Sequence, residues 1–343
     1  RQMCIRDRSV IVADDLSPSE TVQMDKDKIL AFVTVHGSTN SHTAILARMM
    51  NIPALIGVKM DLEALQSGVT AVVDGFQGMV TFDPDEETKA QTETKIQEEA
   101  EKLKLLQELK GKENITLDGR KSNIYANIGS VGDIGYVMEN DAGGIGLFRS
   151  EFLYLGRNDF PTEEEQFQAY KQAVQMMAGK KVIIRTLDIG GDKALPYLGL
   201  PTEENPFLGF RAVRFCLQRK EDIYKPQLRA LLRASAFGKV RIMVPLVTCV
   251  DELRAVKAII EELKQELDAE GIAYDKDIQV GVMMETAAAS LIADILAKEA
   301  DFFSIGTNDL TGYTMAADRG NPDVAYLYSA YNLSLIHISE PTR

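Results

Sequence analysis

The chain lacks tryptophan and holds only three cysteines and three histidines among its 343 residues. Cys4, Cys216 and Cys249 lie far apart and form no CxxC or CxxH pair, so neither a disulfide framework nor a structural zinc site is indicated. We therefore expect a reduced, cytoplasmic setting. No apolar run approaches the length needed to cross a bilayer, and no signal peptide is visible, so we expect neither membrane insertion nor secretion.

Basic residues are scarce relative to acidic ones, with 38 Lys and Arg against 51 Asp and Glu and a net charge of -13. This balance argues against a general binder of nucleic acid or of membrane surfaces, while it allows a local cluster of arginines around a small anion. The length and the 45% hydrophobic content are sufficient for two domains with full cores.

The most distinctive segment is GSTNSHTAILAR, residues 37–48, which holds His42. The apolar run before it predicts a strand that ends in a glycine turn, and the residues after it favour a helix. Side chains that cap helices precede His42, so we expect this histidine at a helix N-terminus. Unpaired N–H groups there favour phosphate and disfavour a protonated imidazole, which suits a nucleophilic histidine. A capping turn with an incidental histidine explains the same residues.

Residues 9–84 predict a compact α/β unit with strands at 9–14 and 28–37 and a late hairpin around the turn DGFQG. Residues 85–112 then predict one long helix, because the run holds no glycine or proline before Gly111. Its apolar residues form a narrow stripe, so we expect one packed side. A helix of this length spans on the order of 40 Å, enough to connect two domains.

From residue 113 onward the pattern repeats strand then helix. The expected strands are residues 122–129, 144–152, 181–190, 240–247, 278–286 and 301–309, and the clearest helices are 163–179, 250–271 and 287–300. Apolar strands joined by amphipathic helices predict a parallel sheet that is covered on its outside. Six such units are visible, so we expect an α/β chain that ends in an incomplete (β/α)8 TIM-type barrel. An open doubly wound sheet is the alternative.

Polar side chains recur where these strands end: Arg149, Arg185, Glu285, Asn308 and Asp309. In barrels the C-terminal ends of the strands carry the functional residues. Guanidinium forks fit carboxylate and phosphate oxygens, and two carboxylates can hold Mg2+. Together they predict a site for a small phosphorylated acid and a divalent metal, although a charged residue at a strand end, taken alone, is more often a capped or salt-bridged residue of the barrel edge.

Several segments, taken in order, carry a family resemblance: GSTNSHTAILARMMNIPAL, GIGLFRSEFLYL, RTLDIGGDKALPYL, ENPFLGFRAVR, MMETAAA and IGTNDLTGYTMAADRGN. They resemble the phosphoenolpyruvate-protein phosphotransferases, the enzyme I family of the bacterial sugar phosphotransferase system, over roughly residues 9–332. The resemblance implies a swivelling phosphohistidine domain over residues 9–84, a linker helix over 85–112 and a phosphoenolpyruvate-binding barrel over 113–332.

The same resemblance implies roles for single residues. His42 falls on the phosphorylated position, and Glu285 with Asp309 on the Mg2+ ligands. The residues implied to bind phosphoenolpyruvate are Arg149, Arg185, Arg211, Asn308, Asp309 and Arg319. Lys193 is a further candidate, for which an ion pair is the alternative. The departures from the family pattern are Ser38 for glycine, Asn40 for threonine, Ala287 for proline and Gly312 for glutamine.

The implied reaction transfers the phosphoryl group of phosphoenolpyruvate to His42 and then to the phosphocarrier protein HPr, the first step of the sugar phosphotransferase system. A homodimer of the full-length protein is also implied. The alternatives are an enzyme like pyruvate phosphate dikinase or phosphoenolpyruvate synthase, and a non-catalytic phosphoacceptor or regulatory protein.

The two ends of the chain match nothing expected of a domain, so we interpret residues 1–8 and 333–343 as non-native remnants. The family's helical HPr-docking subdomain is expected before residue 9, and its general-acid cysteine after residue 332. Cys216 lies in an apolar helical run and is expected in the core. His36 is expected to be structural.

Overall fold

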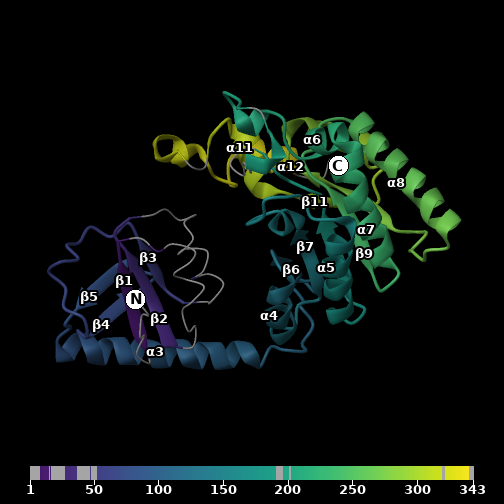
Figure 1. Cartoon of the computed structure of the whole chain (residues 1–343). Helices are drawn as coiled ribbons and strands as arrows, with labels where there is room; N and C mark the ends of the chain where they lie inside the picture. Colours follow the sequence, from purple (N-terminus) through teal and green to yellow (C-terminus); the bar gives the residue numbers. More distant parts are fainter. Residues whose placement is uncertain are drawn as a thin grey trace. The chain divides into compact units, whose positions relative to one another are not determined.

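The computed structural model describes residues 8–14, 16, 28–36, 47, 52–190, 196–200, 202–318 and 321–339. His42, Lys193 and Arg319 lie outside these residues. The chain divides into two compact units, residues 1–109 and 110–343 (Figure 1).

The first unit contains a three-stranded parallel sheet and a hairpin. The sheet has the order β1–β2–β3 and consists of β1 (Ser9–Ala13), β2 (Ile29–Thr34) and β3 (Ala54–Ile56). The antiparallel hairpin consists of β4 (Ala71–Asp74) and β5 (Met79–Phe82). The predicted strands at 9–14 and 28–37 and the predicted hairpin are thus present, whereas β3 is too short to give a sequence signal.

Helix α3 (Glu86–Gln107) follows the hairpin. Asp85 caps its N-terminus by accepting a 2.7 Å hydrogen bond from the N–H of Thr88. The helix ends four residues before Gly111, so its predicted extent was too long. No residue of α3 is buried, and Ile96 and Leu103 are 61% and 59% exposed, so the expected packed side is wrong. The apolar stripe is too narrow to bury a helix of this charge.

The second unit is organised by a six-stranded sheet whose strands are all parallel. Its members are β6 (Ala126–Ile128), β7 (Gly144–Arg149), β8 (Lys181–Arg185), β9 (Val240–Val244), β10 (Gln279–Met284) and β11 (Phe303–Ile305). Their order in space, β6 to β11, is their order in the chain. A doubly wound sheet reverses its order at a switch point, so that alternative is wrong and the sheet is a half-barrel wall.

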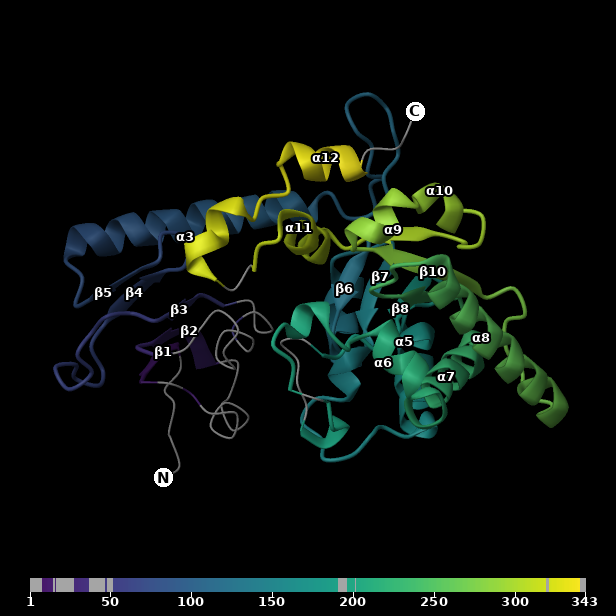
Figure 2. The same ribbon diagram turned by 90° about the horizontal axis from the view of Figure 1, so that it is seen from above.

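Helices lie between these strands and after the last of them. Their bounds are α4 (Ile134–Glu139), α5 (Glu163–Met176), α6 (Val213–Gln218), α7 (Lys225–Ser235), α8 (Val250–Glu270), α9 (Ala287–Leu291), α10 (Ala293–Leu296), α11 (Thr307–Met315) and α12 (Leu333–Ser339). Figure 2 shows α5, α7 and α8 along one face of the sheet, where they pack on its apolar side chains. The single helix expected at 287–300 is broken at Ile292, which separates α9 from α10.

Local sequence explains where the long helices begin and end. Thr162 and Glu165 form a capping box at the start of α5. Gly271 ends α8 in the left-handed conformation at φ 72°. Among the residues that the structure describes, no helix combines the length and the apolar character that a membrane crossing requires.

Candidate active site

The predicted polar residues do gather at the C-terminal edge of the six-stranded sheet. Arg149 and Arg185 are the last residues of β7 and β8, and Glu285 directly follows β10. Asn308 and Asp309 were expected at the end of a strand, but they lie in the first turn of α11. The strand stops at Ile305 because the chain already turns into the helix at Gly306, which brings Asp309 to the same edge.

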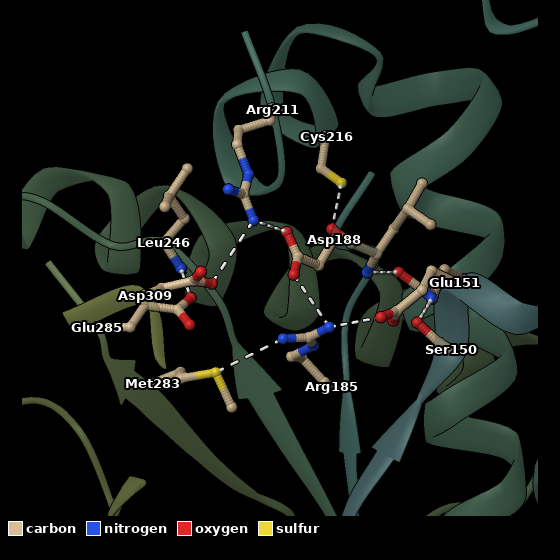
Figure 3. A network of polar contacts seen from close by, with 12 residues as sticks. Ser150, Glu151, Arg185, Asp188, Arg211, Cys216, Leu246, Met283, Glu285 and Asp309 are labelled. Atoms are coloured by element: carbon tan, nitrogen blue, oxygen red, sulfur yellow. Dashed lines mark hydrogen bonds and ion pairs between the residues drawn. The ribbon is translucent and has the colours of Figure 1, made fainter. Parts of the chain in front are cut away.

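Arg185 is held by two carboxylates. Its Nη2 lies 2.6 Å from Oε1 of Glu151 and 2.9 Å from Oδ2 of Asp188 (Figure 3). All three side chains are buried. Buried charges are tolerated when they are paired in this way, so the ion pairs fix the guanidinium in position.

Asp188 also binds the second arginine of the site. Its Oδ1 accepts a 2.8 Å hydrogen bond from Nη2 of Arg211, and the same nitrogen lies 3.7 Å from Oδ2 of Asp309. Asp188 therefore joins two cations that are 26 residues apart in the sequence (Figure 3). We call Glu151, Arg185, Asp188, Arg211, Glu285 and Asp309 the edge cluster.

The charges of these arginines are secured by their carboxylate partners. Burial alone would lower the pKa of Arg185 and of Arg211, but the nearby carboxylates, Asp188 first among them, raise both pKa values above the ordinary arginine value. Arg149 differs, because burial lowers its pKa and its guanidinium stacks 4.7 Å from the ring centroid of Phe152. It remains charged, since arginine does not lose its proton in proteins.

The three arginines share an unusual feature. The Nε atoms of Arg149, Arg185 and Arg211 are buried and have no hydrogen-bond partner within the part of the chain that the structure describes. A buried N–H donor without a partner costs free energy, and such donors are rare outside functional sites. Three cationic side chains at one sheet edge, each with an Nε–H donor that has no partner, fit a ligand rich in anionic oxygens.

Glu285 is the buried carboxylate on the other side of the edge cluster. Burial, reinforced by the nearby charges of Asp188 and Asp309, raises its pKa to about 8, although Arg185 acts in the opposite direction. Gly306 leaves the space for this side chain, since a Cβ at that position would lie 2.7 Å from Oε2 of Glu285.

The edge cluster suits a divalent metal that keeps water and substrate oxygens as ligands. Among the described residues no group of three or more His, Cys, Asp and Glu side chains could hold a metal. Glu285 and Asp309 are two carboxylates whose mutual repulsion a cation would relieve, and Mg2+ is commonly held by one or two carboxylates plus substrate phosphates. The donor set therefore fits Mg2+ and does not form an all-protein cage.

A cleft of about 430 Å³ lies beside Asp309. Its lining residues are Glu204, Asn205, Pro206, Phe207, Leu208, Asn308, Asp309, Gly312, Tyr313, Ala316, Ala317, Asp318 and Tyr328. The main-chain oxygen of Asn308 accepts a 2.7 Å hydrogen bond from the hydroxyl of Tyr328. Asn308 is exposed, so its amide is accessible to a ligand.

Sequence reasoning missed Glu151, Asp188, Tyr313 and Gln227. The first two follow β7 and β8 by two and three residues, so the strand-end rule could have found them. Gln227 is fully buried on α7, where no periodic signal separates it from core positions. Its Oε1 accepts a 2.8 Å hydrogen bond from the N–H of Leu187, beside Asp188.

The cysteines of this unit do not join the edge cluster. Cys216 is fully buried, as expected, and donates to the carbonyl oxygen of Leu187 at 3.7 Å. Burial raises the pKa of its thiol. Cys249 is exposed and precedes α8.

Comparison with known families agrees with this arrangement. Residues 103–340 match the PEP-binding domain of PEP-utilising enzymes, and residues 5–78 match the mobile domain of PEP-utilising enzymes. The first match covers well over half of the chain, and the chain therefore belongs to the PEP-utilising enzymes.

Curated relatives carry the name phosphoenolpyruvate-protein phosphotransferase. The protein of Priestia megaterium is 50% identical over 334 residues, which are 97% of this chain and 58% of the relative. The protein of Staphylococcus carnosus (strain TM300) is 50% identical over 329 residues, which are 96% of this chain and 57% of the relative. The chain thus spans less than two thirds of the length of these relatives.

Proposed function

We propose that the protein to which this chain belongs transfers the phosphoryl group of phosphoenolpyruvate to His42 and then to the phosphocarrier protein HPr. The observation that carries the proposal is the set of buried Nε donors on Arg149, Arg185 and Arg211 beside two carboxylates suited to Mg2+. Relatives that are 50% identical and named phosphoenolpyruvate-protein phosphotransferase support it. The reaction is the cytoplasmic first step of the sugar phosphotransferase system.

The roles that we propose for the parts of the chain follow from the matched families. Residues 9–84 serve as a swivelling phosphohistidine domain, residues 85–112 as a linker helix and residues 113–332 as the substrate-binding half-barrel. The matches to a mobile domain and to a PEP-binding domain support this division. The full-length protein is proposed to be a homodimer.

The edge cluster, together with Arg149, Asn308 and Arg319, would act on phosphoenolpyruvate mainly through charge. Arg149, Arg185, Arg211 and Arg319 hold its carboxylate and phosphate oxygens, and Asn308 donates to the phosphate. Glu285 and Asp309 would hold Mg2+, whose positive charge offsets the charge that develops on the phosphoryl group and on the enolate oxygen.

His42 acts as the nucleophile in its neutral form. One imidazole nitrogen forms a bond to phosphorus while the bond between phosphorus and the enolate oxygen breaks. The enolate then takes up a proton at carbon to become pyruvate. Neither Cys216 nor Cys249 is assigned as the proton donor, because the thiol of Cys216 is fully buried and already donates to the carbonyl oxygen of Leu187, and Cys249 precedes α8 on the surface.

Intact-mass measurement after incubation with phosphoenolpyruvate and Mg2+ tests the proposal. We expect one acid-labile phosphoryl adduct on the wild-type chain and none on His42→Ala. An adduct of equal yield on both chains would contradict the assignment of His42. A chain that binds phosphoenolpyruvate equally well with and without Mg2+ and gains no adduct would instead indicate a non-catalytic binding protein.

A further inference from the structure

Helix α11 contacts Arg211 at two successive turns. Asp309 and Tyr313 are four residues apart and so lie on the same face of the helix. Nη2 of Arg211 lies 3.7 Å from Oδ2 of Asp309, and Nη1 of Arg211 donates to the hydroxyl oxygen of Tyr313 at 3.3 Å. The helix that carries Asp309 therefore holds the arginine through Tyr313 as well.

The hydroxyl of Tyr313 is itself fixed. It donates a 2.5 Å hydrogen bond to the carbonyl oxygen of Phe207, and the ring of Phe207 lies 5.3 Å from the guanidinium carbon of Arg211. A phenol that accepts from a cation and donates to a carbonyl uses both of its hydrogen-bonding capacities, which leaves it one orientation. Tyr313 thereby ties α11 to the segment that precedes Arg211.

Most atoms of the Arg211 guanidinium have a partner in the structure. Nη1 faces Tyr313, Nη2 faces Asp188, and the guanidinium carbon lies over the ring of Phe207, while Nε has no partner within the described ranges. Phe207, Asp309 and Tyr313 also line the 430 Å³ cleft. The residues that orient Arg211 therefore line the cleft that a ligand would enter.

We propose that Tyr313 is a positioning residue, which holds Arg211 in the orientation that meets phosphoenolpyruvate. This inference rests on the proposed function. Tyr313 does not touch the reacting atoms; it sets the direction of a cation that does. Only the hydroxyl is required, so a phenylalanine keeps the packing and loses the effect.

Tyr313→Phe tests the inference against a matched control. Tyr197→Phe removes the same group, since the hydroxyl of Tyr197 donates a 2.6 Å hydrogen bond to the carbonyl oxygen of Tyr154, in a similarly part-buried setting. Single-turnover phosphorylation of His42 is followed by intact mass over a range of phosphoenolpyruvate concentrations. The titration separates the half-saturating concentration from the plateau rate, and thermal unfolding is recorded for each chain.

In Tyr313→Phe we expect the half-saturating concentration to rise about fivefold to tenfold, because a hydrogen bond to a charged group is lost. The plateau rate should change less than about twofold, since the transferring group is not touched. Tyr197→Phe should leave both quantities at the wild-type values.

Three outcomes would overturn the inference. A half-saturating concentration within twofold of the wild type would show that Arg211 does not depend on the hydroxyl. An equal rise in Tyr197→Phe, or a fall in thermal stability of Tyr313→Phe without a change in half-saturation, would show a general structural role. A wild-type chain that gains no phosphoryl group would overturn the proposed function itself, and the positioning role of Tyr313 with it.

Discussion

The backbone N–H of Leu246 donates a 2.6 Å hydrogen bond to Oε1 of Glu285. To do so Leu246 adopts φ 54°, a left-handed conformation that is costly for a residue with a branched side chain. The strained loop after β9 thus orients the carboxylate that we propose as a Mg2+ ligand. Without a cation, this buried carboxylate takes up a proton more readily than an exposed one.

The first prediction concerns stability against pH for Glu285→Gln. The pKa of Glu285 is about 8 in the folded chain against an ordinary 4.5, so between these values the folded state retains a proton that the unfolded state has lost. Stability should therefore fall as pH rises through this window. A neutral glutamine avoids the loss and still accepts the hydrogen bond from Leu246. In chelator-treated samples at pH 9 we expect the variant to be more stable by roughly 2–4 kcal/mol.

Thermal unfolding at pH 5 and pH 9 checks this prediction. The two chains should unfold at similar temperatures at pH 5, where the folded wild type is also neutral at Glu285. Addition of Mg2+ at pH 9 should raise the unfolding temperature of the wild type and leave Glu285→Gln unchanged. A variant that is less stable than the wild type at pH 9 without metal would show that Glu285 is ionised and well paired.

The second prediction uses two glycines on either side of Asp309. In Gly306→Ala the new Cβ would lie 2.7 Å from Oε2 of Glu285, although the backbone φ of -85° suits alanine. We expect a loss of about 1–3 kcal/mol in stability and weaker Mg2+-dependent binding of phosphoenolpyruvate, because the carboxylate must move. Calorimetric titration and urea unfolding measure the two effects.

Gly312→Ala is the matched control. Its Cβ would lie 3.4 Å from the nearest atom, the carbonyl oxygen of Ala317, and the residue is inside α11. Because alanine is the better helix former, we expect stability to be equal or up to about 1 kcal/mol higher. Gly312 lines the cleft but its Cβ would not meet Glu285, so we expect binding to weaken less than in Gly306→Ala. Equal effects of the two substitutions would refute the steric argument at Gly306.

The third prediction concerns Gln227, which connects the segments after β7 and β8. Its Nε2 donates to Oγ of Ser150 at 3.0 Å and to the hydroxyl oxygen of Tyr170 at 3.1 Å, and its Oε1 accepts from Leu187. Gln227→Met keeps the volume but removes all three of these hydrogen bonds, after which the hydroxyl of Tyr170 still donates to Oε1 of Gln166 at 3.2 Å. We expect a loss of about 1–3 kcal/mol in stability and weaker phosphoenolpyruvate binding, because Ser150 and Leu187 adjoin Glu151 and Asp188.

Ser235→Ala controls for the loss of a buried polar group on the same helix. Ser235 lies eight residues further along α7, about 12 Å away. Its hydroxyl donates a hydrogen bond to the carbonyl oxygen of Leu232 and accepts one from the N–H of Asp275. The Ser235→Ala chain should lose stability without a change in its binding of phosphoenolpyruvate. If Ser235→Ala weakened binding as much as Gln227→Met does, the effect would come from global destabilisation rather than from the edge cluster.

The sequence predicted the strands of the half-barrel and the positions of Arg185 and Glu285, because apolar runs and strand ends are local features. It did not predict the partners of the arginines. Whether Asp188 faces Arg211 depends on how the segment after β8 folds back across the edge, and no local pattern encodes that. The helical placement of Asp309 was missed for a related reason, since the strand before it is only three residues long.

We infer that the edge cluster binds phosphoenolpyruvate together with Mg2+, and calorimetric titration of His42→Ala with phosphoenolpyruvate is the experiment that checks this claim. This variant cannot accept the phosphoryl group at His42, so the heat reports binding alone. We expect binding with Mg2+, at least tenfold weaker binding with a chelator, and the same weakness in a chain that also carries Glu285→Gln. Equal affinity under all three conditions would contradict the claim.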